Sequence, residues 1–516
     1  MATLAKQPHE KELFGHPVGL YILFLTEMWE RYSYYGMRAL LTLYMAAKTM
    51  GDNPGLGWSN SESLMLYGWY TMLVYVMSIP GGIIADKYLG QKKSVLVGAI
   101  ILVFGHGVLA IDQEWAFFTG LGLIVLGVGM LKPNISTMVG GLYKPNDIRR
   151  DKGFSIFYIG INVGSLLATS SVGIVAAIYG WHYGFGLAGI CMLLGLIVYL
   201  WGQKYLVHVG NVATVEEKKD DVSIAEMYKR LLKSPKHLLI VFVMICLSLY
   251  AGFTFEGVDH WGYGVLFVFI SLVVGLMMMI YKDLDTQVMK DRFLVILLSF
   301  GLVIVFWGAF EQAGGLMSLY TEQKTNRDFF GLFEIPTAVF QGFNAGFIIL
   351  FAVGVANFWA KRKLKNKEAS SLFKMATGTI IMGTGFVFMV FASLQYEANG
   401  ESAMYWLILA YLFHTIGELC SSPVSLSFIT KLAPARYASL MMGAYFASTG
   451  LGNKVAGILG ENASEYGELT IFASIFIFTI VFGLLVIALL KPLKRLTHGV
   501  EDNETEITEN TIETTT

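Results

Sequence analysis

Long apolar runs, separated by shorter polar connections, extend through almost the whole chain. A helix needs about 20 mostly apolar residues to cross a bilayer. Each run of that order predicts one transmembrane helix, which makes fourteen predicted helices. The runs lie at 18–47, 62–85, 93–111, 116–140, 153–177, 184–204, 237–256, 260–281, 293–320, 336–360, 372–395, 402–431, 436–460 and 470–491.

One polar connection, at about 205–236, is the longest and divides the pattern. Six runs precede it, two follow it, and six more come after those two. We therefore predict an all-α membrane protein of two six-helix bundles with two inserted helices. The predicted parts are a cytoplasmic N-terminal tail at 1–17, a bundle at 18–204, a cytoplasmic linker at 205–236, an inserted hairpin with its connection at 237–292, a second bundle at 293–491, and a disordered cytoplasmic tail at 492–516.

The composition also favours a membrane protein. Of the 516 residues, 55% are hydrophobic and only 15% are charged, and the mean hydropathy is +0.58, far from a soluble globular protein. The first run is too long for a cleaved signal peptide and carries charges within it. Cys191, Cys246 and Cys420 all lie in apolar runs and suggest neither a disulfide nor a metal site. The net charge of −1 argues against a nucleic-acid partner.

Lysine and arginine fall mostly on one side of the predicted membrane. Of the 37 Lys and Arg residues, most lie in the two tails and in the loops of one side. The opposite loops contain Lys48, Lys324 and Arg327. Because positively charged loops stay in the cytoplasm, both termini are predicted to be cytoplasmic, and an even number of spans agrees with that.

Four charged residues lie inside the first apolar run: Glu27, Glu30, Arg31 and Arg38. A charge at the bilayer centre costs on the order of 2.5–3.5 kcal/mol. At 3.6 residues per turn the four fall on one stripe of one helix face, and that stripe must face protein or water. It is either a buried ion cluster that only locks helices together or the lining of a transport pathway, and we favour the pathway.

The connection after the second predicted helix contains a compact motif. Gly82, Asp86 and Gly90 are followed by Gln91-Lys92-Lys93. This spacing matches the loop motif of the major facilitator fold, in which an acidic helix end and a basic turn tie helices together on the cytoplasmic side. The motif and the two six-helix bundles both predict that fold.

Charges of opposite sign occupy equivalent helices of the two predicted bundles. When the inserted pair is not counted, Arg38 on the first helix corresponds to Glu311 on the seventh, which is the first helix of the second bundle. Lys132, beside Pro133 on the fourth helix, corresponds to Glu418 on the tenth. In this fold the binding site lies between the bundles, which rock against each other. We therefore predict that both pairs are latches across the bundles; the alternative is that each charge is satisfied within its own half.

Several polar-tipped residues also lie within predicted spans. Each alone is more often a packing residue than a ligand. Together with Lys132 and Glu418 they predict a wet cavity that offers charges of both signs. They are Tyr35, Tyr75, Tyr158, Asn162, Trp307 and Asn344.

Three segments resemble signatures of one transporter family. The first helix contains EMWERYSYYG at 27–36, and the fifth contains FYIGINVGS at 157–165. The seventh helix contains Phe306-Trp307 followed by Phe310-Glu311-Gln312. With the motif at 82–90 and Lys132-Pro133-Asn134, the chain resembles the proton-dependent oligopeptide transporters (POT, or PTR, family) of the major facilitator superfamily. The inserted pair at 237–281 is typical of bacterial members.

The resemblance implies a proton-coupled symporter in the bacterial inner membrane that imports di- and tripeptides by alternating access. It implies no catalytic residue, no metal and no cofactor other than the coupling proton; the oligomeric state stays open. Tyr445, where a Trp is expected, and Ala345, where a Pro is usual, depart from the pattern, so the resemblance implies the transport class but not the side-chain selectivity. The implied proton-coupling residues are Glu27, Glu30, Arg31 and Glu311; the gate pairs are Arg38–Glu311 and Lys132–Glu418; the implied substrate-binding residues are Arg31, Tyr35, Arg38, Tyr75, Lys132, Tyr158, Asn162, Trp307, Asn344, Glu418 and Ser422.

Three alternatives remain at this stage. A facilitator could instead export drugs or import another charged nutrient such as nitrate, although nitrate favours unpaired cations and here carboxylates match the cations. A membrane enzyme is a second alternative, but His106 and His414 are isolated within spans, and no nucleophile elbow is found in a strand-to-helix context. A passive channel is the third, and it would not need two matched bundles.

Overall fold

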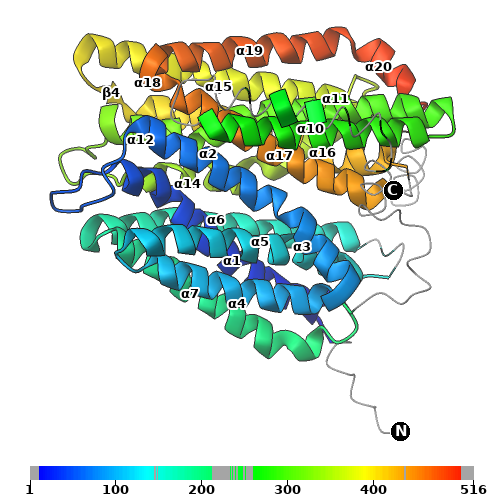
Figure 1. Ribbon diagram of the computed structural model, residues 1–516, viewed down its shortest axis with the longest axis horizontal. Helices are drawn as coiled ribbons and strands as arrows, with labels where there is room; N and C mark the ends of the chain where they lie inside the picture. The colour runs from blue at the N-terminus through cyan, green and yellow to red at the C-terminus, as the bar shows by residue number, and fades with distance from the viewer. Residues whose placement is uncertain are drawn as a thin grey trace.

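The computed structural model describes residues 11–500, except 145, 146, 148, 435, 436 and most of 212–259. The described chain is a bundle of long helices that run side by side in alternating directions (Figure 1). Eleven described helices are long and apolar enough to cross a membrane. α1, with its four charged residues, and α17 run alongside them.

The first group of elements covers the chain up to residue 205. It consists of β1 (Glu12–Leu13), β2 (His16–Pro17), α1 (Val18–Ala46), α2 (Asn60–Val76), α3 (Ser78–Ile84), the π-helical turn η2 (Ala85–Leu89), α4 (Gln91–Leu109), α5 (Glu114–Gly141), α6 (Arg150–Tyr179), α7 (Trp181–Gly202) and the 3₁₀ turn η3 (Gln203–Tyr205).

The second group begins at residue 260. It consists of α10 (His260–Asp283), α11 (Gln287–Phe310), the 3₁₀ turn η4 (Glu311–Ala313), α12 (Leu316–Lys324), β3 (Thr325–Asn326), α13 (Thr337–Phe340), α14 (Gly342–Leu364), α15 (Ser371–Asn399), β4 (Ser402–Ala403), α16 (Met404–Leu432), α17 (Ala438–Glu461), α18 (Ala463–Tyr466), α19 (Glu468–Ala488) and α20 (Leu490–Leu496).

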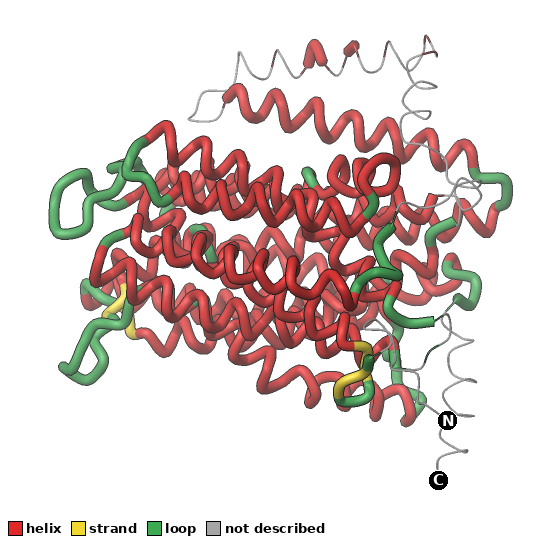
Figure 2. The backbone as a smooth tube through the Cα atoms, turned by 90° about the horizontal axis from the view of Figure 1, so that it is seen from below, coloured by secondary structure: helices red, strands yellow, loops and turns green. Residues whose placement is uncertain are grey.

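Helix accounts for almost all of the described backbone, and the strands are short pieces at the ends of the bundle (Figure 2). β1 pairs with β2 in an antiparallel hairpin, and β3 pairs with β4 in parallel. We call the end of the bundle that carries the connections 47–59 and 325–336 the distal end. The other end, where α1 begins and α20 ends, is the proximal end (Figure 1).

The predicted apolar runs fall on helices wherever the structure describes them. The run at 237–256 lies mostly outside the described residues, so the total of fourteen stays a prediction. The ninth run, 293–320, which is the seventh helix when the inserted pair is not counted, is not one continuous helix: η4 and then Gly315, whose φ is −103° and ψ −111°, separate α11 from α12. α20 covers the first residues of the predicted C-terminal tail, and 501–516 lie outside the described residues.

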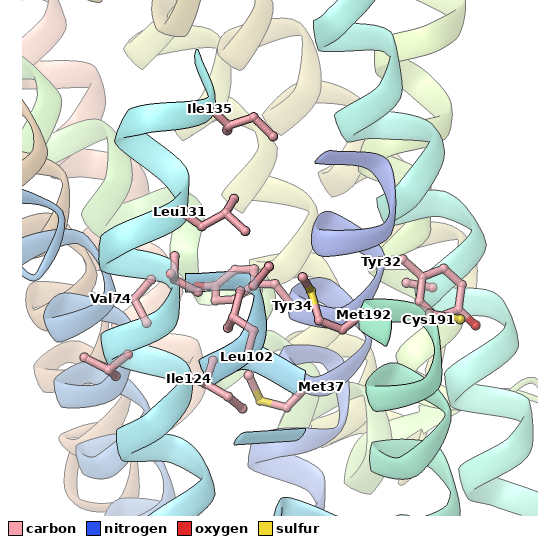
Figure 3. Close-up of a cluster of buried hydrophobic side chains, with 14 of the residues drawn as sticks. Tyr32, Tyr34, Met37, Val74, Leu102, Ile124, Leu131, Ile135, Cys191 and Met192 are labelled. Carbon is pink, nitrogen blue, oxygen red and sulfur yellow. The ribbon is translucent and has the colours of Figure 1, made fainter. Parts of the chain in front are cut away.

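Buried apolar side chains form one large cluster in the first group of helices. Figure 3 shows part of it, where Tyr34 and Met37 of α1 lie near Leu102 of α4, Ile124 of α5 and other buried side chains. A second cluster joins α10, α11, α15, α16 and α17. A third consists mainly of second-group residues and also includes Leu43 and Leu64 from the first group. The cores thus follow the two groups, and apolar contacts also connect them.

The groups also touch through glycines and distal hydrogen bonds. A Cβ on Gly457 of α17 would lie 2.7 Å from the Cα of Gly68 of α2, so no larger residue fits there without a shift. Small residues at such crossings let membrane helices approach closely. The side chains of Asn60 and Gln323 exchange two hydrogen bonds of 3.0 Å. The distal ends of the two groups are therefore in contact.

The motif after the second predicted helix forms a tight proximal turn. η2 ends at Gly90, whose φ of +76° suits glycine, and Gly90 N donates to Ala85 O at 2.8 Å. The next turn is tied to the end of α7, because Lys92 O accepts a 2.8 Å hydrogen bond from the Tyr199 hydroxyl. The start of α4 is therefore joined to the end of α7, and the predicted ties through Asp86 and the basic side chains stay a prediction.

The N-terminal hairpin is attached at the proximal end. Arg149 Nη1 lies 3.0 Å from Glu12 Oε1, and His16 Nδ1 lies 2.8 Å from the Tyr143 hydroxyl. Arg149 also binds Asp147, and its hydrogen bonds hold the pKa of that carboxyl below its usual value. The first residues of the predicted N-terminal tail that the structure describes are thus bound to the start of α6.

Candidate functional site: a buried charge network between the helix groups

Arg31 lies between two carboxylates of its own helix. Arg31 Nε is 3.0 Å from Glu27 Oε1, and Arg31 Nη2 donates to Glu30 Oε1 at 2.7 Å. All three residues are at most 2% exposed. The face of α1 positions them, because residues three and four apart are neighbours on a helix. Two buried carboxylates thus share one guanidinium, an arrangement in which one acidic group can gain or lose a proton.

Lys132 of α5 faces the same network. Its Nζ lies 3.7 Å from the centroid of the Tyr75 ring, close enough for a cation–π contact. Its charge also acts on Glu27 and Glu30. Pro133 follows in the same helix and leaves the backbone at this point without one intrahelical hydrogen bond. The cation is therefore presented inside the bundle on an aromatic face.

Arg38 and Glu311 form an ion pair between the two helix groups. Arg38 Nε lies 3.0 Å from Glu311 Oε1, and both side chains are less than a tenth exposed. The guanidinium also lies 5.6 Å from the centre of the Tyr35 ring. Glu311 lies in η4, where the seventh helix is broken. That break moves the carboxylate from the end of α11 toward α1.

The hydroxyl of Tyr67 joins this pair. It donates to Glu311 Oε1 at 2.6 Å and accepts from Arg38 Nε at 2.9 Å. Tyr67 lies on α2 and is 1% exposed. Tyr67 is not among the site residues predicted from the sequence. A usable signal was present: Tyr67 and Tyr70 are polar-tipped residues one turn apart in an apolar run.

Glu418 of α16 is held from the neighbouring helix. Asn344 Nδ2 donates to Glu418 Oε2 at 2.8 Å and also lies 3.1 Å from Thr415 Oγ1. Glu418 is 8% exposed. Because charge-assisted hydrogen bonds are about twice as strong as neutral ones, α14 fixes the orientation of this carboxylate.

The remaining predicted lining residues have local contacts. Asn162 Nδ2 donates to the backbone oxygen of Tyr158, one turn earlier on α6, at 3.0 Å. Trp307 packs edge-on against Phe310, with ring centroids 5.2 Å apart. The carbonyl oxygen of Ser422 accepts from Ser425 Oγ at 3.0 Å.

Tyr445 and Ala345, which depart from the family pattern, are both buried. The Tyr445 hydroxyl is 3.4 Å from Ser425 Oγ of α16, and the side chain is 7% exposed. Ala345 is fully buried at the start of α14, where it follows Asn344 in the sequence. Tyr445 therefore contacts the helix that carries Glu418, and Ala345 lies on the helix that carries Asn344.

The structure brings one predicted gate pair into contact. Arg38 and Glu311 are joined, whereas Lys132 contacts Tyr75 and Glu418 contacts Asn344. Among the described residues, no group of three or more His, Cys, Asp or Glu could hold a metal ion. The site therefore combines buried charges of both signs: Arg31, Arg38 and Lys132 with Glu27, Glu30, Glu311 and Glu418.

Comparison with known proteins decides the family. The sequence profile of the POT family matches residues 92–469. This chain belongs to the POT family. It is a multi-pass membrane transporter with the major facilitator fold, not an enzyme, and the family resemblance of its signature segments is confirmed.

Similar POT proteins align along nearly the whole chain. An uncharacterized transporter of Bacillus subtilis, YclF, is 36% identical over 507 residues, which cover 96% of this chain and 98% of that protein. The peptide transporter YePEPT of Yersinia enterocolitica is 34% identical over 518 residues, covering 98% of this chain and 100% of that protein.

A solved structure has the same arrangement of helices. The crystal structure of a POT family transporter in complex with a thioalcohol conjugated peptide superposes with a TM-score of 0.80 at 31% identity. The match covers 94% of this chain and 98% of that chain. The predicted all-α major facilitator fold is thereby confirmed.

Proposed function

We propose that this POT protein is a proton-coupled symporter that imports di- and tripeptides by alternating access. The observation that carries the proposal is the network of buried charges of both signs between the two helix groups. A peptide is a zwitterion and needs a cation for its carboxylate and a carboxylate for its ammonium group. Relatives named as peptide transporters and a POT structure with a peptide conjugate support this substrate class.

The proton would enter through the carboxylates around Arg31. Glu27 and Glu30 share a single guanidinium at 0–2% exposure. Such a pair can bind a proton without leaving an uncompensated buried charge. We assign proton coupling to Glu27, Glu30 and Arg31, and to Glu311 as a fourth group. Because Glu311 contacts Arg38 of the other helix group, a change in its charge would affect the movement of the two groups relative to each other.

The peptide would lie between Lys132 and Glu418. Lys132 would face the peptide carboxylate and Glu418 its ammonium group, with Tyr35, Tyr75, Tyr158, Asn162, Trp307, Asn344 and Ser422 around them. Lys132 contacts Tyr75, and Glu418 accepts from Asn344. Lys132 and Glu418 would also be the second gate pair on the extracellular side, and a bound zwitterion would replace their attraction for each other.

We also propose the orientation and the parts predicted above. The proximal end, where α1 begins and α20 ends and where most of the described basic loops lie, would face the cytoplasm of a bacterial cell, and both termini would be cytoplasmic. The distal contact between Arg38 and Glu311 would then close the outer side. We propose the boundaries predicted from the sequence for the two bundles (18–204 and 293–491), the linker (205–236) and the inserted pair with its connection (237–292).

Uptake into proteoliposomes tests the proposal directly. Dipeptide accumulation should require an inward proton gradient, and nitrate or drugs should neither be accumulated nor compete. Lys132→Ala and Glu418→Ala should each weaken binding at least tenfold, because each removes a charged hydrogen bond of about 1.5–3 kcal/mol. Blocking the peptide's amino group should harm the wild type severely but add little in Glu418→Ala. An undiminished penalty in that variant would place ammonium recognition elsewhere.

A further inference from the structure

The Arg38–Glu311 contact has a third participant whose role the family assignment does not define. Glu311 Oε1 receives the Tyr67 hydroxyl at 2.6 Å and lies 3.0 Å from Arg38 Nε. The same hydroxyl oxygen accepts from Arg38 Nε at 2.9 Å. The three atoms therefore form a closed triangle, with one corner each from α1, α2 and η4.

The backbone after η4 packs directly on this triangle. A Cβ on Gly314 would lie 2.2 Å from the Tyr67 hydroxyl oxygen and 2.9 Å from Arg38 Nε. Gly314 O also accepts from Thr42 Oγ1 of α1 at 3.0 Å. Any movement of η4 and α12 away from α1 and α2 must break these contacts together.

The setting leaves little room for water to replace the hydroxyl. Tyr67 is 1% exposed, and Glu311 is 4% exposed. A buried carboxylate that loses a donor without gaining water is strongly disfavoured. The Tyr67 hydroxyl accepts a hydrogen bond from Arg38 and donates one to Glu311. Consecutive hydrogen bonds of this kind polarise and strengthen one another.

We propose that Tyr67 is a positioning residue of the Arg38–Glu311 latch, so that α2 as well as α1 holds the seventh helix at the distal end. Its hydroxyl orients the Glu311 carboxylate toward Arg38 and couples release of the latch to movement of α2. The assignment of a latch rests on the proposed transport function, but the contact itself can be tested without transport.

The chain offers a matched control one turn away. Tyr70 lies on the same helix and is 3% exposed. Within the described residues its hydroxyl has no hydrogen-bond partner. Replacing Tyr67 or Tyr70 by Phe removes the same atom from the same helix at nearly the same depth, but only Tyr67→Phe breaks a contact with the ion pair.

The experiment measures the separation of the distal ends in the full chain. The three native cysteines are replaced by serine, and new cysteines are introduced at Met50 and Phe330, which are both 87% exposed. Spin labels on these two cysteines report the distance between the distal ends by pulsed electron paramagnetic resonance. The samples are lipid nanodiscs with no peptide and no proton gradient. The ratio of separated to contacting molecules should rise about tenfold or more in Tyr67→Phe, as expected for one hydrogen bond to a charged group. Tyr70→Phe should stay within about twofold of the wild type.

A double variant separates positioning from general packing. If Tyr67 acts through Glu311, Tyr67→Phe should change the ratio little once Glu311→Gln is present. The proposal would be overturned if the ratio in Tyr67→Phe alone equalled that of the wild type. It would also be overturned if the change in the double variant equalled the product of the changes in the two single variants. Because no substrate is used, a failed peptide-uptake assay would contradict the transport proposal and leave this result intact.

Discussion

Asn344 on α14 donates a 2.8 Å hydrogen bond to Glu418 on α16, so the carboxylate predicted to receive the peptide's ammonium group is held by an amide of the same helix group. It is therefore oriented before any substrate or cation from the other group reaches it. Preorganised charges of this kind bind with less reordering.

Asn344→Leu should weaken dipeptide binding about tenfold, because the charge-assisted hydrogen bond that orients Glu418 is lost. Asn462→Leu is the control, since the Asn462 amide donates at 2.7 Å to the backbone oxygen of Ile458, one turn earlier, and Asn462 is not among the proposed binding residues. Equilibrium binding of a fluorescent dipeptide in detergent measures both. Equal losses in the two variants would mean that Asn344 has no special relation to Glu418.

Glu30→Gln should abolish proton-driven accumulation while peptide counterflow stays measurable. Glu30 is fully buried and bonded to Arg31. The amide fills the same space but cannot accept a proton at any physiological pH. Concentrative uptake and counterflow of labelled dipeptide are compared in the same liposomes. Near wild-type accumulation in Glu30→Gln would remove this carboxylate from the coupling step.

Exchanging the charges of Arg38 and Glu311 should recover part of the transport that single neutralisations lose. Each single change leaves a buried partner charge, which costs about 3–5 kcal/mol before water relieves it. Arg38→Glu combined with Glu311→Arg restores opposite charges at two positions whose native side chains lie 3.0 Å apart. Uptake rates of the two single variants and the double variant give the answer. A double variant as inactive as the worse single one would show that the pair does more than hold the groups together.

Gly457→Ala should destabilise the protein by about 1–3 kcal/mol, because the added methyl group would lie 2.7 Å from the Cα of Gly68 and must push α17 away from α2. Gly301→Ala on α11 is the control, since a Cβ there meets nothing within 4 Å. That substitution should be neutral or slightly stabilising, because alanine favours helix over glycine by about 1 kcal/mol. Thermal unfolding in detergent distinguishes the two, and equal midpoints would contradict the close packing of α2 and α17.

The sequence by itself determined the class of the molecule and the chemistry inside it. Runs of about 20 apolar residues leave few structures other than spanning helices. Charges within such runs are costly, so Glu27, Arg38, Lys132 and Glu418 stood out without any structure. The signature at 27–36 indicated the family, which the comparisons confirm. The class and the charged candidates depend on local composition and helical period, which a linear sequence contains, and the family depends on the resemblance of the signature segments.

Only the tertiary structure decided which of these groups touch. Lys132 lies on Tyr75, Asn162 turns to its own helix, and Tyr67 reaches Glu311 across 244 positions of the chain. Such choices depend on where helices cross and where one breaks, as at Gly315. A spacing of three or four residues specifies one face of a helix. Which side chain of another helix meets that face depends on how closely the small residues of the two helices allow them to pack.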